Sequence, residues 1–167
     1  MTGTFDDPAK AAAGPAATVH ASCVRVAGRG VLIRGASGAG KSHLSFALLL
    51  AGRAGIAAPA ELVADDRVAL SRRGTRLFAA APPRLAGLIE VRGAGLRRLP
   101  FVAESAVDLV VDLGAADAAR LPEPFARRVV IEGVDIERLA VLPGGDAVQQ
   151  VLALILTEAA PDAGPVR

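Results

Sequence analysis

The sequence predicts an α/β domain built around a mixed β-sheet. Short apolar runs of the kind that form buried strands recur along the chain, separated by turn residues. Two segments, residues 41–53 and 146–158, read as strong helices. Parallel strands need long crossover connections, usually helices, whereas antiparallel strands need only a hairpin. Many strands with so few helices therefore favour a mixed sheet over a purely parallel one.

In the first half of the chain, strands are predicted where a short and mainly apolar run lies between turn residues. These strands are, in order, residues 19–26, 30–34, 61–64, 67–71 and 76–80. Residues 41–53 are predicted to be a helix, because a mainly apolar segment follows a glycine-rich turn there. Arg72-Arg73-Gly74-Thr75 is expected to join the last two strands of this half as a hairpin turn.

In the second half, Pro82-Pro83 interrupts the chain before further short strands. These strands are residues 88–91, 106–113, 129–131 and 135–142. Residues 146–158 carry apolar side chains at helical spacing and are expected to close the domain. The two ends, residues 1–17 and 159–167, read as flexible tails, which leaves one domain at 18–158.

Composition excludes several classes of protein. The 167 residues suffice for one domain with a real core, and 52% hydrophobic with 22% charged residues is typical of a soluble globular protein. A net charge of +2, without a Lys/Arg block, Trp or Tyr, does not support nucleic-acid binding. The longest apolar run, 44–51, is too short to cross a membrane, and no signal peptide is evident. The lone Cys23 excludes a disulfide framework, fits a reducing cytoplasm and is expected to be a small buried hydrophobe.

The segment Gly35-Ala36-Ser37-Gly38-Ala39-Gly40-Lys41-Ser42 has the P-loop spacing G-x-x-x-x-G-K-S, between a predicted strand and a predicted helix. In such a loop the backbone N–H groups and the helix N-terminus bind phosphate oxygens. Lys41 would reach the β- and γ-phosphates, and the Ser42 hydroxyl would bind Mg²⁺. The structural alternative is a glycine-rich turn that matches the pattern by chance.

Three further positions carry candidate chemistry. Asp65 and Asp66 close an apolar strand, and phosphoryl transfer needs a carboxylate near the metal and often another that accepts a proton. Neighbours in a strand point to opposite faces, so the two can share one task only if the strand has ended. Glu90 lies inside an apolar run, with Arg92 expected on the same strand face. The structural alternatives are a solvated turn for Asp65 and Asp66, an ion pair with Arg92 for Glu90, and a surface histidine for His20.

Together these residues resemble the HPr kinase/phosphorylase family, in particular its catalytic domain. The resemblance rests on His20, the loop 35–42, VADDR at 63–67 and AAPPRLAGLIEVRGAG at 80–95, in this order. It covers about residues 19–142, and the short chain is similar to the compact form found in alphaproteobacteria. The segment LIEVRGAG is much more specific to the family than the P-loop.

The resemblance implies a bacterial cytoplasmic serine kinase that uses ATP and Mg²⁺ to phosphorylate HPr, a phosphocarrier of the phosphotransferase system. Many family members also reverse the reaction by phosphorolysis and release pyrophosphate. The implied fold is similar to the nucleotide-binding core of phosphoenolpyruvate carboxykinase. Family members often assemble as hexamers, so the resemblance also allows a homo-oligomer.

The resemblance also implies roles for single residues. Residues 35–42 would bind the phosphates, and Ser42 with Glu90 would bind Mg²⁺. His20 and Lys41 would be catalytic. The pair at 65–66 matches the base that takes the serine proton and acts as an acid in reverse. We favour Asp66 for this role, with Asp65 as the other candidate.

The chain departs from the family pattern at three places. His43 follows the P-loop serine, where the family usually has an acid. Residues 52–59 lengthen the connection between the P-loop helix and Asp65. The family's late catalytic arginine has no match in residues 142–146, which affects phosphorolysis more than phosphorylation. Two other functions therefore stay open: a P-loop small-molecule kinase or ATPase, and a nucleotide-binding sensor without phosphotransfer.

Overall fold

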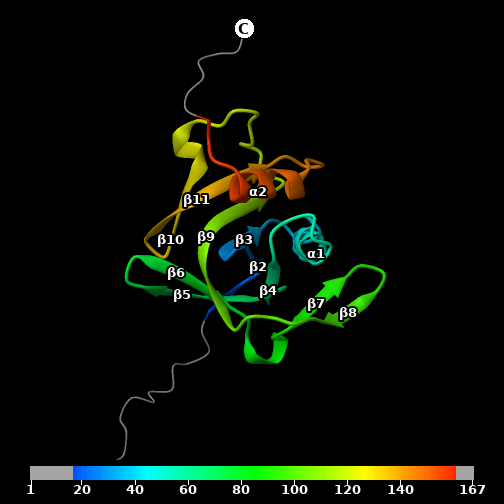
Figure 1. The fold of residues 1–167 in the computed structure, drawn as a ribbon. Coiled ribbons are helices and arrows are strands. Elements are labelled where there is room, and N and C mark those ends of the chain that lie inside the picture. Colours follow the sequence, from blue (N-terminus) through cyan, green and yellow to red (C-terminus); the bar gives the residue numbers. More distant parts are fainter. Residues whose placement is uncertain (1–16, 161–167) are drawn as a thin grey trace, which may run out of the picture.

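A mixed sheet of nine strands organises residues 17–160, the part of the chain that the computed structural model describes (Figure 1). Its order is β1-β5-β6-β9-β3-β2-β4, with β11 paired to β9 and β10 to β11, and β7 and β8 form a separate hairpin. The strands are β1 Thr18–Val19, β2 Ser22–Val26, β3 Arg29–Arg34, β4 Ala60–Ala64, β5 Val68–Arg73, β6 Arg76–Ala80, β7 Leu88–Val91, β8 Gly95–Arg98, β9 Glu104–Leu113, β10 Arg128–Ile131 and β11 Val134–Val141. The α-helices in this part are α1 Lys41–Arg53 and α2 Ala147–Leu156, and short 3-10 helices cover Pro83–Leu85 and Pro124–Arg127. The predicted mixed α/β fold is confirmed.

Strand β9 joins the parallel and antiparallel parts of the sheet. It pairs antiparallel with β6 at its start, and parallel with both β3 and β11 further along. The carboxyl ends of β3, β9 and β11 therefore meet at one edge of the sheet. There Asp112 of β9 accepts hydrogen bonds from Arg34 of β3 and Arg138 of β11. Burial alone raises the pKa of this carboxyl, but the two arginines hold it below its usual value.

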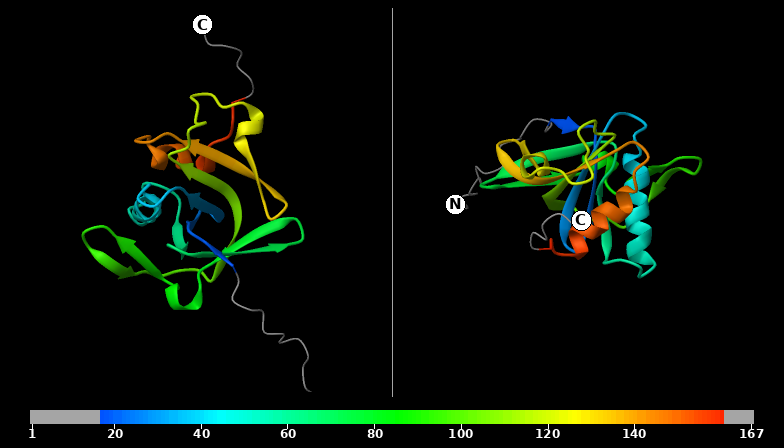
Figure 2. Two further views of the ribbon diagram at one scale, coloured as in Figure 1. Left: turned by 180° about the vertical axis from the view of Figure 1, so that it is seen from behind. Right: turned by 90° about the horizontal axis from the view of Figure 1, so that it is seen from above.

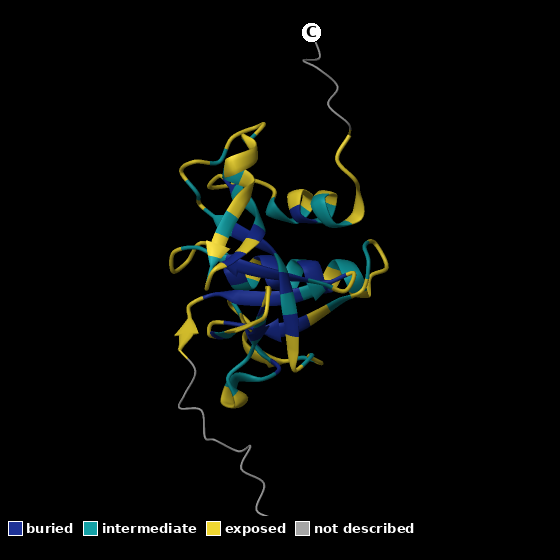
Figure 3. Ribbon diagram, turned by 90° about the vertical axis from the view of Figure 1, so that its left-hand side faces the viewer, coloured by how far each residue is buried: buried dark blue, intermediate teal, exposed yellow. Residues whose placement is uncertain are grey.

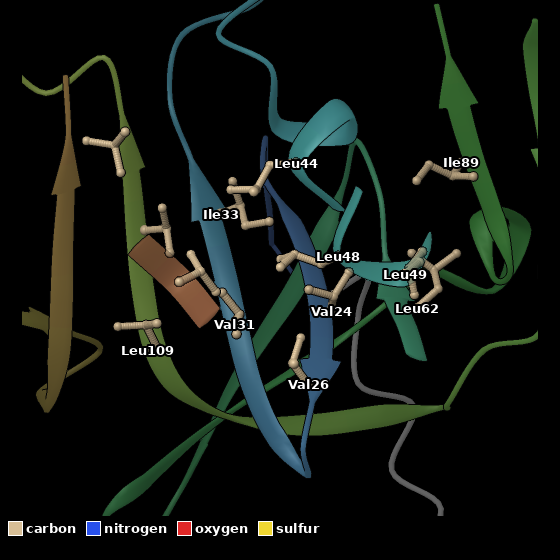
Figure 4. Packing of buried hydrophobic residues seen from close by; sticks show 13 residues of the cluster. Val24, Val26, Val31, Ile33, Leu44, Leu48, Leu49, Leu62, Ile89 and Leu109 are labelled. Carbon is tan, nitrogen blue, oxygen red and sulfur yellow. The ribbon is translucent and has the colours of Figure 1, made fainter. Parts of the chain in front are cut away.

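Both α-helices cover one face of the sheet (Figure 2). Alternate residues of β2, β3 and β9 point toward this face, since neighbouring side chains in a strand point to opposite sides. They pack with Leu44, Leu48 and Leu49 of α1 (Figure 4). Val151 of α2 belongs to the same cluster. Burying these side chains fixes α1 against the sheet and so fixes the loop that precedes it.

The opposite face packs against strands instead of helices. Cys23, Leu32 and Val110 lie there with the inner side chains of β5, β6 and β11, and the buried residues concentrate in the central strands (Figure 3). Cys23 is buried as expected, and this burial, with a smaller contribution from Asp108, raises the pKa of its thiol to about 12. The cysteine is therefore a packing residue and not a reactive thiol.

Several element boundaries differ from the prediction. The predicted strand 19–26 is two strands, because β1 pairs with β5 whereas β2 pairs with β3 and β4. The predicted turn at 72–75 is tighter, because β5 continues to Arg73 and pairs with Arg76. Strand β8 was not predicted, since its side chains are all exposed. The remaining predicted strands and both helices agree with the structure to within two residues at each end.

The predicted tails, 1–17 and 159–167, lie almost entirely outside the described residues, so the domain boundaries remain a prediction. In the described part of the chain, neither helix combines the length and the apolar character that a membrane crossing requires.

We predict that Gly30→Ala destabilises the sheet. A Cβ atom at this position would lie 1.9 Å from the Ala106 carbonyl oxygen, so β3 and β9 would have to separate. The expected loss is about 3 kcal/mol of unfolding free energy, measured by urea denaturation. The control is Gly28→Ala in the preceding turn, where a Cβ meets nothing within 4 Å but φ is +77°. It should lose about 1 kcal/mol, and equal losses for the two variants would contradict the prediction.

Candidate active site

The glycine-rich loop connects β3 to α1 at the edge where the parallel strands end. Gly38 and Gly40 have φ of 80° and 97°, which side chains rarely adopt, and a Cβ on Gly35 would lie 3.0 Å from the Leu113 carbonyl oxygen. Gly40 is the N-cap of α1, without a side-chain hydrogen bond and without an acid in the first turn of the helix. No acidic residue of the helix itself therefore neutralises the positive end of its dipole.

Lys41 is held against the loop it follows. Its Nζ donates to the carbonyl oxygens of Gly35 and Ala36, both at 2.9 Å, and the side chain is mostly buried. The Ala39 N–H donates to the Ala36 carbonyl and closes the turn. The Lys41 ammonium group is thus held against the backbone of the loop that precedes α1.

Asp65 is a buried carboxylate at the centre of the site, only 3% exposed. Its oxygens accept hydrogen bonds from the Ser22 hydroxyl at 2.6 Å, from the Ser42 hydroxyl at 2.9 Å and from the Glu90 N–H at 3.2 Å. A buried charge needs such partners, because it has lost its water. The carboxylate and the Ser42 hydroxyl together form an oxygen pair of the kind that binds Mg²⁺.

Asp66 has the opposite environment. The strand β4 has ended at Ala64, and the backbone of Asp66 has φ of 64°, in the left-handed region. The Asp66 side chain is 64% exposed, and its Oδ1 lies 3.4 Å from Nε2 of His20. The pairing of β1 with β5 brings these two residues together, because His20 follows β1 and Asp66 precedes β5.

Glu90 and Arg92 lie on the far side of the site, on and after β7. The strand ends at Val91, so Arg92 belongs to the turn, and the expectation that it shares a strand face with Glu90 is wrong. No ion pair joins Glu90 to Arg92 within residues 17–160. Both side chains line the same cavity as the P-loop. Glu90 as a metal ligand stays a prediction.

A cavity of about 500 Å³ brings most of these groups together. The residues that the sequence predicts for the site and that line this cavity are His20, Ser37, Gly38, Gly40, Lys41, Ser42, Asp65, Asp66 and Glu90. Gly35, Ala36 and Ala39 do not line it, although the first two supply the carbonyls that hold Lys41. His43, Phe46, Val91 and Arg92 complete the lining. The volume falls within the range of ordinary ligand pockets.

No motif in the sequence indicates a role for Ser22. It lies in an apolar strand, and only the register of β2 against β4 places its hydroxyl on Asp65. Within the described residues, no three His, Cys, Asp or Glu side chains gather as a metal cluster. A Mg²⁺ ion here would therefore need phosphate oxygens besides Asp65 and Ser42, which is the usual arrangement for this ion.

Comparison with known families settles the relationship. The family model described as "HPr Serine kinase C-terminal domain" matches residues 12–119. The chain belongs to this family. The resemblance inferred from the sequence motifs is thereby confirmed, and the match contains both the P-loop and the Asp65–Asp66 pair.

Relatives of the HPr serine kinase family are similar over most of the chain. The HPr kinase/phosphorylase of Mycoplasma mycoides is 30% identical over 140 residues, 76% of this chain and 42% of that protein. The HPr kinase/phosphorylase of Burkholderia lata is 35% identical over 153 residues, 87% of this chain and 45% of that protein. The chain thus spans less than half the length of these curated relatives. The solved HPr(Ser) kinase/phosphatase structure from Coxiella burnetii matches with a TM-score of 0.69 and 25% identity, covering 84% of this chain and 94% of the other.

Proposed function

We propose that this chain is an ATP-dependent serine kinase that acts on an HPr-like phosphocarrier protein in the cytoplasm. The observation that carries the proposal is the arrangement of the 500 Å³ cavity. A phosphate-binding loop faces a buried carboxylate on one side and an exposed carboxylate with a histidine on the other. Kinases need these parts: phosphate ligands, a metal ligand and a proton acceptor that the acceptor hydroxyl can reach. The family relationship and the names of the relatives support the choice of acceptor.

The phosphates of ATP would lie over the loop at 35–42. The N–H groups at the start of α1 and the Lys41 ammonium are the donors, and the helix dipole favours the negative charge. Ser42 and Asp65 fit a Mg²⁺ ion, and Glu90 faces the same cavity as a further oxygen ligand. When bound, Mg²⁺ neutralises charge on the phosphate oxygens. Glu90 is exposed, so its carboxylate is free to turn toward the phosphates.

Asp66 is the proposed general base. The serine hydroxyl oxygen attacks the terminal phosphorus, ADP leaves, and the hydroxyl proton passes to the Asp66 carboxylate. Exposure makes Asp66 accessible to a protein substrate, whereas buried Asp65 is already engaged by two hydroxyls and one N–H. His20, at 3.4 Å, is placed to orient the Asp66 carboxylate. In the reverse direction the protonated Asp66 would act as the acid.

Phosphorylation is the direction that the site supports best. The loop at 142–146 contains no arginine, and Arg92 is the arginine that lines the cavity in residues 17–160. Arg92 lies in the turn after β7, on the Glu90 side of the cavity, where a protein substrate would approach. The fold similarity to the phosphoenolpyruvate carboxykinase core remains part of this proposal.

The decisive experiment is incubation with ATP, Mg²⁺ and a purified HPr-like protein, with intact mass as the readout. We predict that HPr gains one phosphoryl group. Lys41→Ala should lower the rate by on the order of 10²–10³, because it removes one charge that stabilises the transferred phosphate. Circular dichroism checks that the variant remains folded. Label on a metabolite but not on HPr would indicate a small-molecule kinase, and ATP binding without turnover would indicate a sensor. Activity of Lys41→Ala within a few-fold of wild type would overturn the P-loop assignment.

We further predict that Asp66→Asn lowers turnover far more than ATP affinity, because a base acts only when the hydroxyl attacks. Asparagine also tolerates the left-handed backbone of this position, so the substitution leaves the geometry unchanged. Asp65→Asn is the matched comparison and should raise the Mg²⁺ requirement instead. Initial rates and ATP titration calorimetry separate the two effects. Wild-type rates of HPr phosphorylation in both variants would mean that neither aspartate is the base.

The third prediction of this site concerns His43, which replaces the acid that relatives usually have. It lies in the first turn of α1. A carboxylate there would interact favourably with the helix dipole and could bind the metal or its water. We expect His43→Asp to lower the Mg²⁺ concentration that gives half-maximal kinase activity at fixed ATP. His43→Asn, similar in size but neutral, is the control and should leave this concentration unchanged. Overlapping wild-type and His43→Asp curves would show that the position does not affect metal binding.

A further inference from the structure

The β7–β8 hairpin carries an excess of positive charge beside the active-site cavity. Residues 81–103 contain four arginines and one acid, Glu90, whereas the whole chain has a net charge of only +2. The arginines are all exposed, and they are Arg84, Arg92, Arg97 and Arg98. The hairpin is a separate two-stranded sheet, and it projects from the domain on the side where α1 lies (Figure 1). The positive charge is therefore concentrated on one projecting element.

The two arginines of β8 lack the acidic partners that many arginines of this chain have. Ion pairs with carboxylates hold Arg25, Arg29, Arg34, Arg73, Arg76, Arg128 and Arg138. Within residues 17–160, neither Arg97 nor Arg98 forms an ion pair, and every side chain of β8 is exposed. The described part of the chain thus leaves both guanidinium groups available to another molecule.

The register of the hairpin connects its outer surface to the active-site cavity. Arg98 pairs with Leu88, and Leu96 pairs with Glu90, so these four side chains share one face. Arg97 lies between Leu96 and Arg98 on β8 and points to the other face. Leu96 is 63% exposed, and Glu90 also lines the active-site cavity. The face that carries Arg98 and Leu96 is therefore continuous with the wall of the cavity.

The base of the hairpin is fixed to the domain. Ile89 is fully buried in the cluster that contains the apolar side chains of α1. The Leu99 N–H donates to the Gly87 carbonyl oxygen at 2.8 Å, and the Glu90 N–H donates to Asp65. A surface that is already held in place loses little conformational entropy when a partner binds to it.

We propose that Arg97 and Arg98 bind acidic side chains on the surface of the protein whose serine is phosphorylated. The proposal rests on the proposed kinase function and adds to it the surface that selects the acceptor protein. Arg92, in the turn of the same hairpin, lines the cavity together with Asp66, the proposed base. A protein held by the hairpin therefore lies against the mouth of the cavity. Complementary charge accelerates the encounter of two proteins and orients them.

An acidic protein surface fits this hairpin better than a nucleic acid does. Protein interfaces combine apolar contacts with polar groups, and arginine is enriched in them. The exposed Leu96 between Glu90 and the two arginines matches that combination. Single-stranded nucleic acids bind through bases that stack on aromatic side chains, and the chain has neither Trp nor Tyr.

The test measures phosphorylation of a purified HPr-like protein at several NaCl concentrations. At low salt, the double variant Arg97→Gln/Arg98→Gln should raise the KM for the acceptor protein about tenfold. Its kcat and its KM for ATP should change less than twofold. The wild-type KM for the acceptor should rise with salt, because ions screen the attraction, and that of the variant should rise less steeply.

The matched control is Arg53→Gln/Arg120→Gln. It also removes two exposed arginines that form no ion pair in the described chain, but these residues lie outside the active-site cavity. It should leave the KM for the acceptor protein unchanged. An unchanged KM in Arg97→Gln/Arg98→Gln, or an equal rise in the control, would overturn the docking surface and leave the kinase assignment intact.

The remaining outcomes separate this inference from the proposed function. A wild-type KM that does not depend on salt would contradict the docking surface without the use of any variant. A DNA duplex that binds the wild type but not Arg97→Gln/Arg98→Gln, with an unchanged KM for the acceptor, would assign the hairpin to nucleic acid instead. Absence of HPr phosphorylation by the wild type would overturn the proposed function and the docking surface with it.

Discussion

One buried carboxylate connects the separate parts of the site. Asp65 accepts hydrogen bonds from β2 through Ser22, from α1 through Ser42 and from β7 through the backbone of Glu90. The burial of a charge is unfavourable unless hydrogen bonds replace the lost water, so these three donors are held in place as a group. The P-loop helix, the strand that precedes the carboxylates and the hairpin carrying Glu90 are thereby fixed relative to one another.

The sheet supplies the platform for this arrangement. Parallel pairing of β3, β9 and β11 brings three strand ends to one edge, and Asp112 joins Arg34 to Arg138 across it. The loops that follow these strands become neighbours although they are far apart in the sequence. The glycine-rich loop, which follows β3, lines the active-site cavity from this edge.

Local features of the fold could be predicted from the sequence, whereas features that depend on partner strands could not. The predicted bounds of α1 and β7 match the structure because Gly40 and a short apolar run determine them locally. The division of 19–26 was missed, because nothing in its apolar pattern shows where the chain changes partner. Likewise, Asp65 and Asp66 were found as a pair, but their opposite exposures depend on where β4 ends.

The backbone of Asp66 combines an unfavourable conformation with an exposed carboxylate. A left-handed φ of 64° is uncommon for a residue with a side chain, and the surrounding turn must compensate for it. Glycine would remove the backbone strain at this position and stabilise the folded chain. It would also remove the one carboxylate of the Asp65–Asp66 pair that is accessible to solvent and to a protein partner. Selection for higher thermal stability at this residue would therefore oppose the role that we propose for Asp66.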